Sequence, residues 1–143
     1  MRRLLALMLI ALALAVTARA GSAPLLVRNP TLSASAVAFE LAGDRWSVPL
    51  GGGDARRLTA STVAEVGPRF SPDGAWIAFT VNDGENPDVH VMPANGGTPR
   101  RLTWGAARNE VVGWTNDSRR VLFRSWRLSS TDHPRLFTIG LEG

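Results

Sequence analysis

The sequence contains an internal repeat, and this repeat restricts the fold more than any other feature. Residues 44–59 align with residues 88–103 without a gap, at a constant offset of 44 positions. Both copies begin with Asp, share a proline and a Gly-Gly pair, and end in Arg-Arg-Leu-Thr. A second match, of Ala38-Phe39, Ala78-Phe79 and Leu122-Phe123, recurs after 40 and 44 positions. A period in the low forties, built from strand-length runs between turn residues, is typical of β-propeller blades.

The second copy of the repeat gives the clearest element boundaries. Ser71-Pro72-Asp73-Gly74 has the composition of a tight turn, because Pro presets φ, Asp bonds to the backbone and Gly accepts a positive φ. Trp76–Val81 follows as a strand rich in β-forming residues. We therefore predict an all-β fold, a partial β-propeller of about three four-stranded antiparallel blades. The blades are predicted to span about 25–59, 66–103 and 111–143.

The third blade is predicted to be incomplete. The first two blades carry an outer strand after their Gly-Gly turn, whereas the third reaches Gly143 without one. Because propellers close with at least about four blades, we expect the chain to be the N-terminal part of a longer protein. The alternative is a small protein that closes its ring by forming an oligomer.

Residues 1–20 differ from the rest and have the layout of a secretory signal peptide. Two arginines precede an apolar run of 13 residues, Leu4–Val16, and Ala18-Arg19-Ala20 fits a small-x-small cleavage site. The run is shorter than the roughly 20 residues that span a bilayer. We predict a signal-peptide helix, cleavage after Ala20, and a mature chain of residues 21–143 that is exported to the periplasm or the medium, with no stable membrane span. The alternative is an uncleaved amphipathic or anchoring helix.

Charge and cysteine content exclude two classes of protein. The chain has 16 basic residues, all of them arginine, and 12 acidic ones, which gives a formal net charge of +4. Three of the arginines lie in residues 1–20, which contain no acid, so the predicted mature chain carries only +1. This balance argues against a nucleic-acid-binding protein, which needs clustered positive charge. The absence of cysteine excludes a disulfide-stabilised scaffold.

Several segments of the mature chain resemble the start of the first propeller of the tricorn protease family, a group of large serine peptidases that trim oligopeptides. The matching segments are 25–30, 43–49, 68–74, 88–93, 112–115, 122–125 and 135–139. The resemblance implies that a parent protein is a serine peptidase whose catalytic residues lie outside this chain. It also implies oligopeptide or protein substrates that reach the site through the full-length protein, which could itself be a homo-oligomer. The propeller would then serve substrate access or filtering, although the family's usual location is the cytoplasm.

Two other functions stay open, because the Ser-Pro-Asp-Gly turn is shared by other propellers. One is a TolB-type periplasmic propeller that binds proteins and catalyses nothing. The other is the propeller of a prolyl-oligopeptidase-like peptidase. A longer sequence would separate these functions by the domains that come after the blades.

The residues themselves offer no catalytic site. Nucleophilic hydrolysis needs an activated Ser or Cys beside a base, and the sequence has neither a Gly-x-Ser-x-Gly motif nor a cysteine. His90 occupies the repeat position of Trp46 and Phe137, which indicates a packed strand residue. His133 lies in a polar segment beside a proline, where a surface histidine is expected.

Metal and cofactor sites are not predicted either. Residues 82–88 are rich in oxygen ligands, but their spacing differs from that of a calcium loop, and a solvated turn explains them. Glu40, Glu65 and Glu110 are isolated in the sequence, so no carboxylate pair can be proposed. The glycines at 51–53 lack the residues that complete a phosphate-binding loop.

One residue is a candidate for substrate binding. Arg108 lies in the segment between the second and third blades, and such loops line the mouth of a propeller channel, where a peptide carboxylate could be bound. The repeated pairs Arg56-Arg57 and Arg100-Arg101 are expected at blade edges or in ion pairs between blades. The tryptophans divide into a core group and an exposed group. Trp46, Trp76 and Trp114 are expected in the core, and Trp104 and Trp126 are expected to be exposed.

Overall fold

The computed structural model describes residues 26–128 and 133–143 and consists, in these residues, of strands joined by turns. The predicted signal segment and its cleavage site after Ala20 lie outside the described residues. No helix among the described residues is long and apolar enough to cross a membrane.

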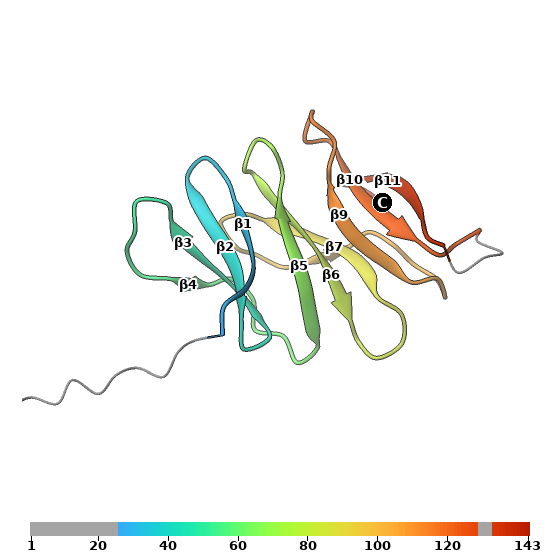
Figure 1. Cartoon of the computed structure of the whole chain (residues 1–143), viewed down its shortest axis with the longest axis horizontal. Helices are drawn as coiled ribbons and strands as arrows, with labels where there is room; N and C mark the ends of the chain where they lie inside the picture. Colours follow the sequence, from blue (N-terminus) through green and yellow to red (C-terminus); the bar gives the residue numbers. More distant parts are fainter. Residues whose placement is uncertain (1–25, 129–132) are drawn as a thin grey trace, which may run out of the picture.

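The strands form three antiparallel sheets in chain order, which we call the first, second and third blades. The first blade contains β1 (Arg28–Leu32), β2 (Ala36–Leu41), β3 (Asp44–Pro49) and β4 (Arg56–Arg57). The second contains β5 (Ala64–Phe70), β6 (Trp76–Asn82), β7 (Asp88–Pro93) and β8 (Arg100–Arg101). The third contains β9 (Asn109–Trp114), β10 (Arg120–Ser125) and β11 (Arg135–Gly140). Figure 1 shows the blades side by side, with the first strands β1, β5 and β9 adjacent to one another, as a propeller requires.

The strands begin at different residues from those predicted. The first blade starts at Arg28, because Leu26 and Val27 are 74% and 49% exposed and pair with no other strand. β5 starts at Ala64 rather than near Val66, since the buried Glu65 holds its beginning against the first blade.

The predicted tight turn joins β5 to β6. The Ser71 hydroxyl donates to the Asp73 carboxylate at 2.5 Å, and the same carboxylate accepts the Ala75 N–H at 3.0 Å. Gly74 takes the left-handed conformation, at φ +71°. The third blade repeats this geometry with Thr115 in place of Ser71 and Asp117 in place of Asp73.

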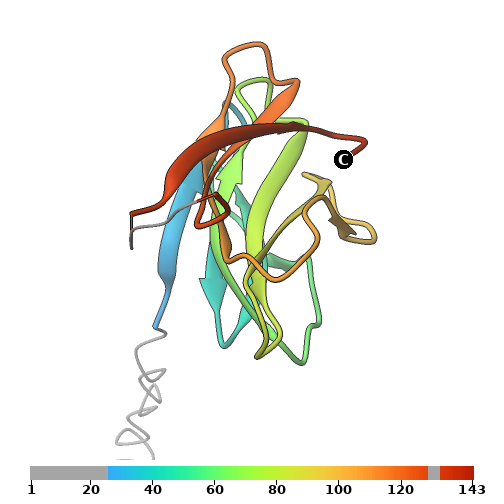
Figure 2. The same ribbon diagram turned by 90° about the vertical axis from the view of Figure 1, so that its right-hand side faces the viewer.

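Two apolar clusters lie between the blades. The cluster between the first and second blades consists of Ala38, Phe70, Ile77, Phe79 and Met92. The cluster between the second and third blades consists of Ala78, Val89, Val91, Leu102, Val121 and Phe123. Because each cluster draws side chains from two neighbouring sheets, a blade completes its core only against its neighbour. Figure 2, which turns the third blade toward the viewer, shows β11 in front of the other strands.

In the second and third blades, the first strand also forms a hydrogen bond with the second strand of the preceding blade. Glu40 accepts the backbone N–H of Gly67 at 2.7 Å, and Thr80 accepts that of Val111 at 3.0 Å. Gly67 reaches this position at φ +64°, in a bulge of β5. The repeat therefore places an equivalent hydrogen bond across each joint between blades, beside other bonds that differ between the two joints.

Candidate functional site

Arg108, the residue predicted to bind substrate, ends the loop between β8 and β9. Glu110 and Arg124 face each other across the β9–β10 pair. The Nε of Arg108 donates to one oxygen of Glu110 at 2.5 Å, and the Nε of Arg124 donates to the other at 2.6 Å. One carboxylate thus fixes two guanidinium groups that are each about half exposed, at 56% and 50%.

Trp126 adds an aromatic surface to this pair of arginines. The guanidinium carbons of Arg108 and Arg124 lie 5.0 and 5.6 Å from its ring centroid, within the range of cation–π attraction. The backbone N–H of Trp126 donates to the Arg108 carbonyl at 3.2 Å, which holds the ring beside the loop. The sequence predicted both Arg108 and an accessible Trp126 but gave no sign that they touch.

The charge balance of the cluster favours an anion. Burial opposes the ionisation of Glu110, but hydrogen bonds from Arg124 and Arg108 outweigh it and lower the pKa of the carboxyl group. Glu110 is therefore ionised at neutral pH, and the group of two arginines and one glutamate keeps one net positive charge.

The cluster borders a hollow of about 740 Å³ lined by Asn86, Ala106, Ala107, Arg108 and Trp126. The contacts of Arg108 with the described residues use Nε and Nη2, which leaves Nη1 available to a ligand. A carboxylate could accept from Nη1, while an apolar group beside it could pack on Trp126. We call Arg108, Glu110, Arg124 and Trp126 the Arg108 cluster.

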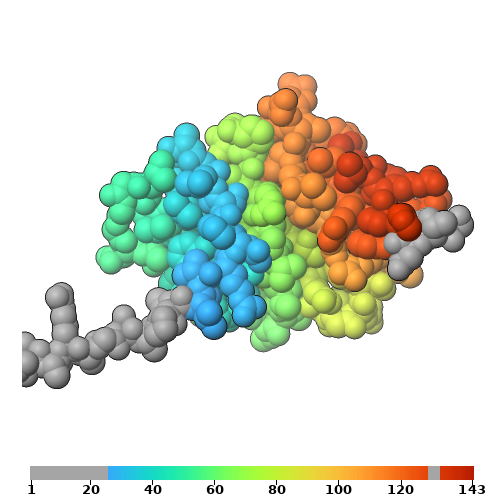
Figure 3. Space-filling view, in the orientation of Figure 1, coloured from blue at the N-terminus to red at the C-terminus, as the bar shows by residue number. Residues whose placement is uncertain are grey.

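In Figure 3 the blades adjoin one another, with orange and red marking the region of the third blade.

A buried polar network supports the loop that carries Arg108. Asp88 accepts hydrogen bonds from Thr103 at 2.5 Å and from Asn109 at 3.0 Å, and it pairs with Arg101. Asn109 also donates to the Ala107 carbonyl at 2.7 Å. Asn109, the residue after Arg108, is therefore fixed to the second blade, and its side chain in turn holds the carbonyl of Ala107, the residue before Arg108.

A second cavity, of about 350 Å³, lies between the first and second blades. Its lining includes Arg28, Glu40 and Glu65. Glu40 and Glu65, which are isolated in the sequence, both line this cavity, because β2 and β5 meet at the joint between the first and second blades. Asn29 and Gly67 donate to Glu40, and Thr59 donates to Glu65 at 2.7 Å. Both carboxylates thus already hold protein partners.

The two histidines lie in different surroundings. The His90 ring stacks on Phe79 with centroids 6.0 Å apart, and its Nδ1 lies 3.4 Å from the Asp88 carbonyl oxygen. Burial lowers the pKa of His90, partly offset by the Asp88 carbonyl. This is the packed strand environment that the repeat indicated. His133 precedes β11 and is exposed.

The arginines of the two repeated Arg-Arg pairs form different kinds of ion pair. Arg57 and Arg101 form ion pairs inside their own blades, with Asp44 and Asp88, rather than between blades. Arg100 does reach the next blade, where it pairs with Glu142 at 3.0 Å.

The tryptophan prediction is correct for Trp104, which is 69% exposed. Trp76 and Trp114 are partly buried and pack against the cluster between the second and third blades, as expected of core residues, and Trp46 is partly buried. The expectation that Trp126 is exposed is wrong, because its ring is partly buried beside Arg108 and Arg124. The oxygen-rich segment 82–88 forms turns in which Asn82 and Asp83 bond to backbone N–H groups. Within the described ranges, no three His, Asp or Glu side chains gather as metal ligands would.

The sheets, their order and the joints between them define the class: the chain is part of a β-propeller. Residues 24–143 match the family described as the tricorn protease N-terminal beta propeller domain, and the chain belongs to this family.

Two relatives from Streptomyces coelicolor agree with this assignment. Tricorn protease homolog 1 is 38% identical over 123 residues, which cover 85% of this chain and 12% of the relative. Putative tricorn protease homolog 2 is 42% identical over 91 residues, or 62% of this chain and 8% of the relative. The chain therefore spans only a small part of each of these relatives.

Solved structures support the fold. The crystal structure of the tricorn protease superposes with a TM-score of 0.64 at 23% identity, over 71% of this chain and 11% of that one. TolB from Acinetobacter baumannii gives 0.64 at 21% identity, over 80% of this chain and 30% of that one. Because both identities are low, these likenesses concern the propeller architecture.

Proposed function

We propose that this chain is the non-catalytic N-terminal propeller segment of an exported, tricorn-like serine peptidase that degrades oligopeptides. The observation that carries the proposal is the match of residues 24–143 to the tricorn N-terminal propeller family. In this proposal the propeller serves substrate access or filtering, and the nucleophile and its base belong to other parts of the parent protein.

The Arg108 cluster is the part of the propeller that we assign to the substrate. Arg108 is half exposed beside a hollow, is oriented by Glu110 and lies against Trp126. A peptide that passes this point could place a carboxylate on Nη1 of Arg108 and an apolar side chain on the indole. Binding of this kind would select peptides by charge before they reach the catalytic residues.

The test uses the full-length parent protein and compares Arg108→Ala with the unmodified sequence. For oligopeptides with a free carboxylate we expect KM to rise about tenfold, the size of one lost charge-assisted hydrogen bond, with kcat unchanged. The same peptides with amidated ends should show little change.

Arg119→Ala is the matched control, because Arg119 is an exposed arginine of the β9–β10 turn outside the Arg108 cluster. It should leave both parameters unchanged. Equal kinetics for Arg108→Ala and the unmodified protein would remove Arg108 from the proposal. A full-length protein without any peptidase activity would contradict the peptidase assignment itself.

Export is proposed from residues 1–20 and has its own test. These residues, joined to a phosphatase that is active only outside the cytoplasm, should give phosphatase activity. The exported native protein should begin at Gly21 by N-terminal sequencing. An exported form that keeps Met1 would contradict cleavage after Ala20.

A further inference from the structure

A pocket of about 390 Å³ lies between the segment that follows β4 and the turn that joins β7 to β8. One wall consists of residues 58–61, and the opposite side consists of Glu65 and residues 97–99. Every lining residue lies in or between the first two blades, and each of these blades has four strands. The shape of the pocket therefore depends only on these two blades.

The wall formed by residues 58–61 is fixed to β3. The backbone N–H of Arg45 donates to the Thr59 hydroxyl at 3.0 Å, and the backbone N–H of Ser61 donates to the Asp44 carboxylate at 3.0 Å. The Ser61 hydroxyl accepts the N–H of Val63 at 3.1 Å. These bonds hold the wall in place before a ligand arrives.

Glu65 is the one acidic residue of the lining, and half of its carboxylate has no partner. Oε2 accepts from the Thr59 hydroxyl at 2.7 Å and lies 3.6 Å from Nη1 of Arg45. Among the described residues, Oε1 takes part in no hydrogen bond or ion pair. The side chain is only 5% exposed, and it runs toward Thr59, which lines this pocket and not the 350 Å³ cavity. A nearly buried carboxylate oxygen is therefore left for a ligand in the pocket.

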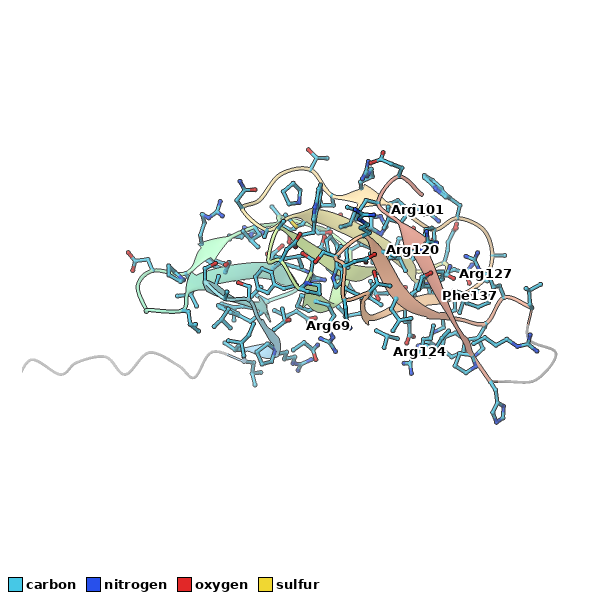
Figure 4. All side chains as sticks on the ribbon, turned by 90° about the horizontal axis from the view of Figure 1, so that it is seen from above. Arg69, Arg101, Arg120, Arg124, Arg127 and Phe137 are labelled. Carbon is cyan, nitrogen blue, oxygen red and sulfur yellow. The ribbon has the colours of Figure 1, made fainter. Side chains whose placement is uncertain are left out.

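The charges around the pocket favour a cation. Arg45 is attracted by three carboxylates, those of Glu65, Glu40 and Asp44, and Arg57 forms an ion pair with Asp44. Glu40, Arg45 and Glu65 together then keep one net negative charge. In Figure 4 the labelled arginines 120, 124 and 127 lie at the end of the molecule that the third blade forms, away from this pocket.

The repeat shows that these groups are not needed for the fold. At the joint between the second and third blades, 44 positions further on, Asn109 stands in the place of Glu65 and Trp104 in that of Ala60. That joint is built without a buried carboxylate at this place, although burial of an ion pair such as Arg45 with Glu65 carries a desolvation cost. A binding role explains why the first joint has a carboxylate and a small residue at these places.

We propose that this pocket binds the lysine side chain of a peptide, with its ammonium group donating to Oε1 of Glu65. An ammonium group is a compact donor that needs only one carboxylate oxygen, whereas the planar fork of arginine is matched by two. Because Thr59 and Arg45 already use Oε2, the pocket favours lysine over arginine. The apolar stem of the lysine packs between Leu58 and Pro99, and the proposal does not depend on the peptidase assignment.

The experiment measures dissociation constants for three small compounds with the full-length parent protein, by saturation-transfer NMR. The compounds are the Nα-acetyl methylamides of lysine, of norleucine and of arginine, which have neither a free amino terminus nor a free carboxylate. We expect the lysine compound to bind at least about tenfold more tightly than the norleucine compound, because only lysine brings an ammonium group to Glu65. It should bind about threefold or more tightly than the arginine compound.

Two variants localise the binding to this pocket. Ala60→Trp copies Trp104 of the next joint, fills the wall of the pocket without a change of charge, and should weaken lysine binding at least about tenfold. Ala55→Trp makes the same substitution at an exposed alanine of the first blade outside the pocket and should leave the binding unchanged. The double variant Arg45→Val with Glu65→Asn also copies the next joint and should remove the difference between lysine and norleucine.

Three results would overturn the proposal. The first is equal affinity for the lysine and norleucine compounds, or no binding of either. The second is unchanged lysine binding in Ala60→Trp, or an equal loss in Ala55→Trp. The third is a folded double variant that still prefers lysine to norleucine. If the double variant does not fold, the comparison of Ala60→Trp with Ala55→Trp decides.

Discussion

The two joints between blades use equivalent positions for different chemistry. In the first joint, between the first and second blades, Arg45 is completely buried and lies 3.6 Å from the carboxylate of Glu65. Its guanidinium also sits 4.4 Å from the centroid of Phe79. In the second joint, between the second and third blades, Val89 occupies the place of Arg45 and Asn109 that of Glu65. One joint encloses an ion pair, whereas the other has an aliphatic side chain and an amide.

The difference shows which part of a joint the fold requires. Among the described residues, Nε and Nη2 of Arg45 are buried without a hydrogen-bond partner. Burial lowers the pKa of Arg45 to about 10, although Glu65 opposes that shift. The second joint reaches the same backbone geometry without a buried guanidinium. The fold therefore does not require the Arg45–Glu65 ion pair, and both residues can be replaced together. Replacement of only one of them leaves the other buried without its partner.

The largest effect should come from the second joint. Asp88→Ala removes the acceptor of Arg101, Thr103 and Asn109 in a buried position. We expect the free energy of unfolding, measured by urea denaturation, to fall by about 3–5 kcal/mol. Asp54→Ala, at an exposed position, is the control and should change it by less than about 0.5 kcal/mol. A similar loss in both variants would mean that Asp88 is not central to the joint.

A smaller loss is expected when the first joint loses only its acid. Glu65→Gln removes the ion-pair partner of the buried Arg45, which then has only the weaker attraction of Glu40 and Asp44. The guanidinium keeps its bond to the backbone carbonyl of residue 65 at 3.0 Å. We expect a loss of about 3 kcal/mol in the same measurement. The double variant Arg45→Val with Glu65→Asn copies the second joint and should return to within about 1 kcal/mol of the unmodified protein. A double variant as unstable as Glu65→Gln would show that the two joints are not interchangeable.

The equivalent hydrogen bonds from Gly67 to Glu40 and from Val111 to Thr80 offer a milder test. Thr80→Val removes the acceptor of the Val111 N–H and should cost about 1–2 kcal/mol. Glu40→Gln keeps an oxygen acceptor for Gly67 in the first joint and should cost less. Thr98→Val, at an exposed position, serves as the control. If Thr80→Val and Thr98→Val change the free energy of unfolding equally, the bond from Val111 to Thr80 does not stabilise the joint.

The smallest effect concerns pH. Burial lowers the pKa of His90 in the folded protein, so the unfolded chain, with an ordinary pKa of about 6.5, binds more protons below that pH. The free energy of unfolding should therefore decrease as the pH falls from about 7.5 to about 5.5. His90→Phe, which copies Phe137 of the third blade, should remove this part of the decrease. An unchanged pH profile in His90→Phe would assign the decrease to other groups.

The repeat in the sequence predicted the blades and the β5–β6 turn, because both depend on residues close together in the chain. The repeat also includes the residues that form the buried polar network, since Asp44, Arg57 and Thr59 recur as Asp88, Arg101 and Thr103. The contacts across the joints were not predictable in the same way. Their partners, such as Glu65 and Asn109, lie at equivalent positions but differ in residue type and belong to the next blade.

The candidate site was predicted only in part. Arg108 followed from its place between two blades, whereas Glu110, Arg124 and Trp126 join it through pairing of β9 with β10 and the return of the chain after β10. A charge pattern within one loop cannot reveal a cluster whose members come from three segments.

The hydrogen bonds across the joints also bear on the order in which the molecule folds. Glu40 and Gly67 are separated by 27 residues and Thr80 and Val111 by 31, so both partners of each bond are present soon after the later strand has been synthesised. We expect a preformed β2 to offer the Glu40 carboxylate to β5, and a preformed β6 to offer Thr80 to β9. Assembly can therefore proceed blade by blade from the N-terminal side, with each blade serving as the template for the next.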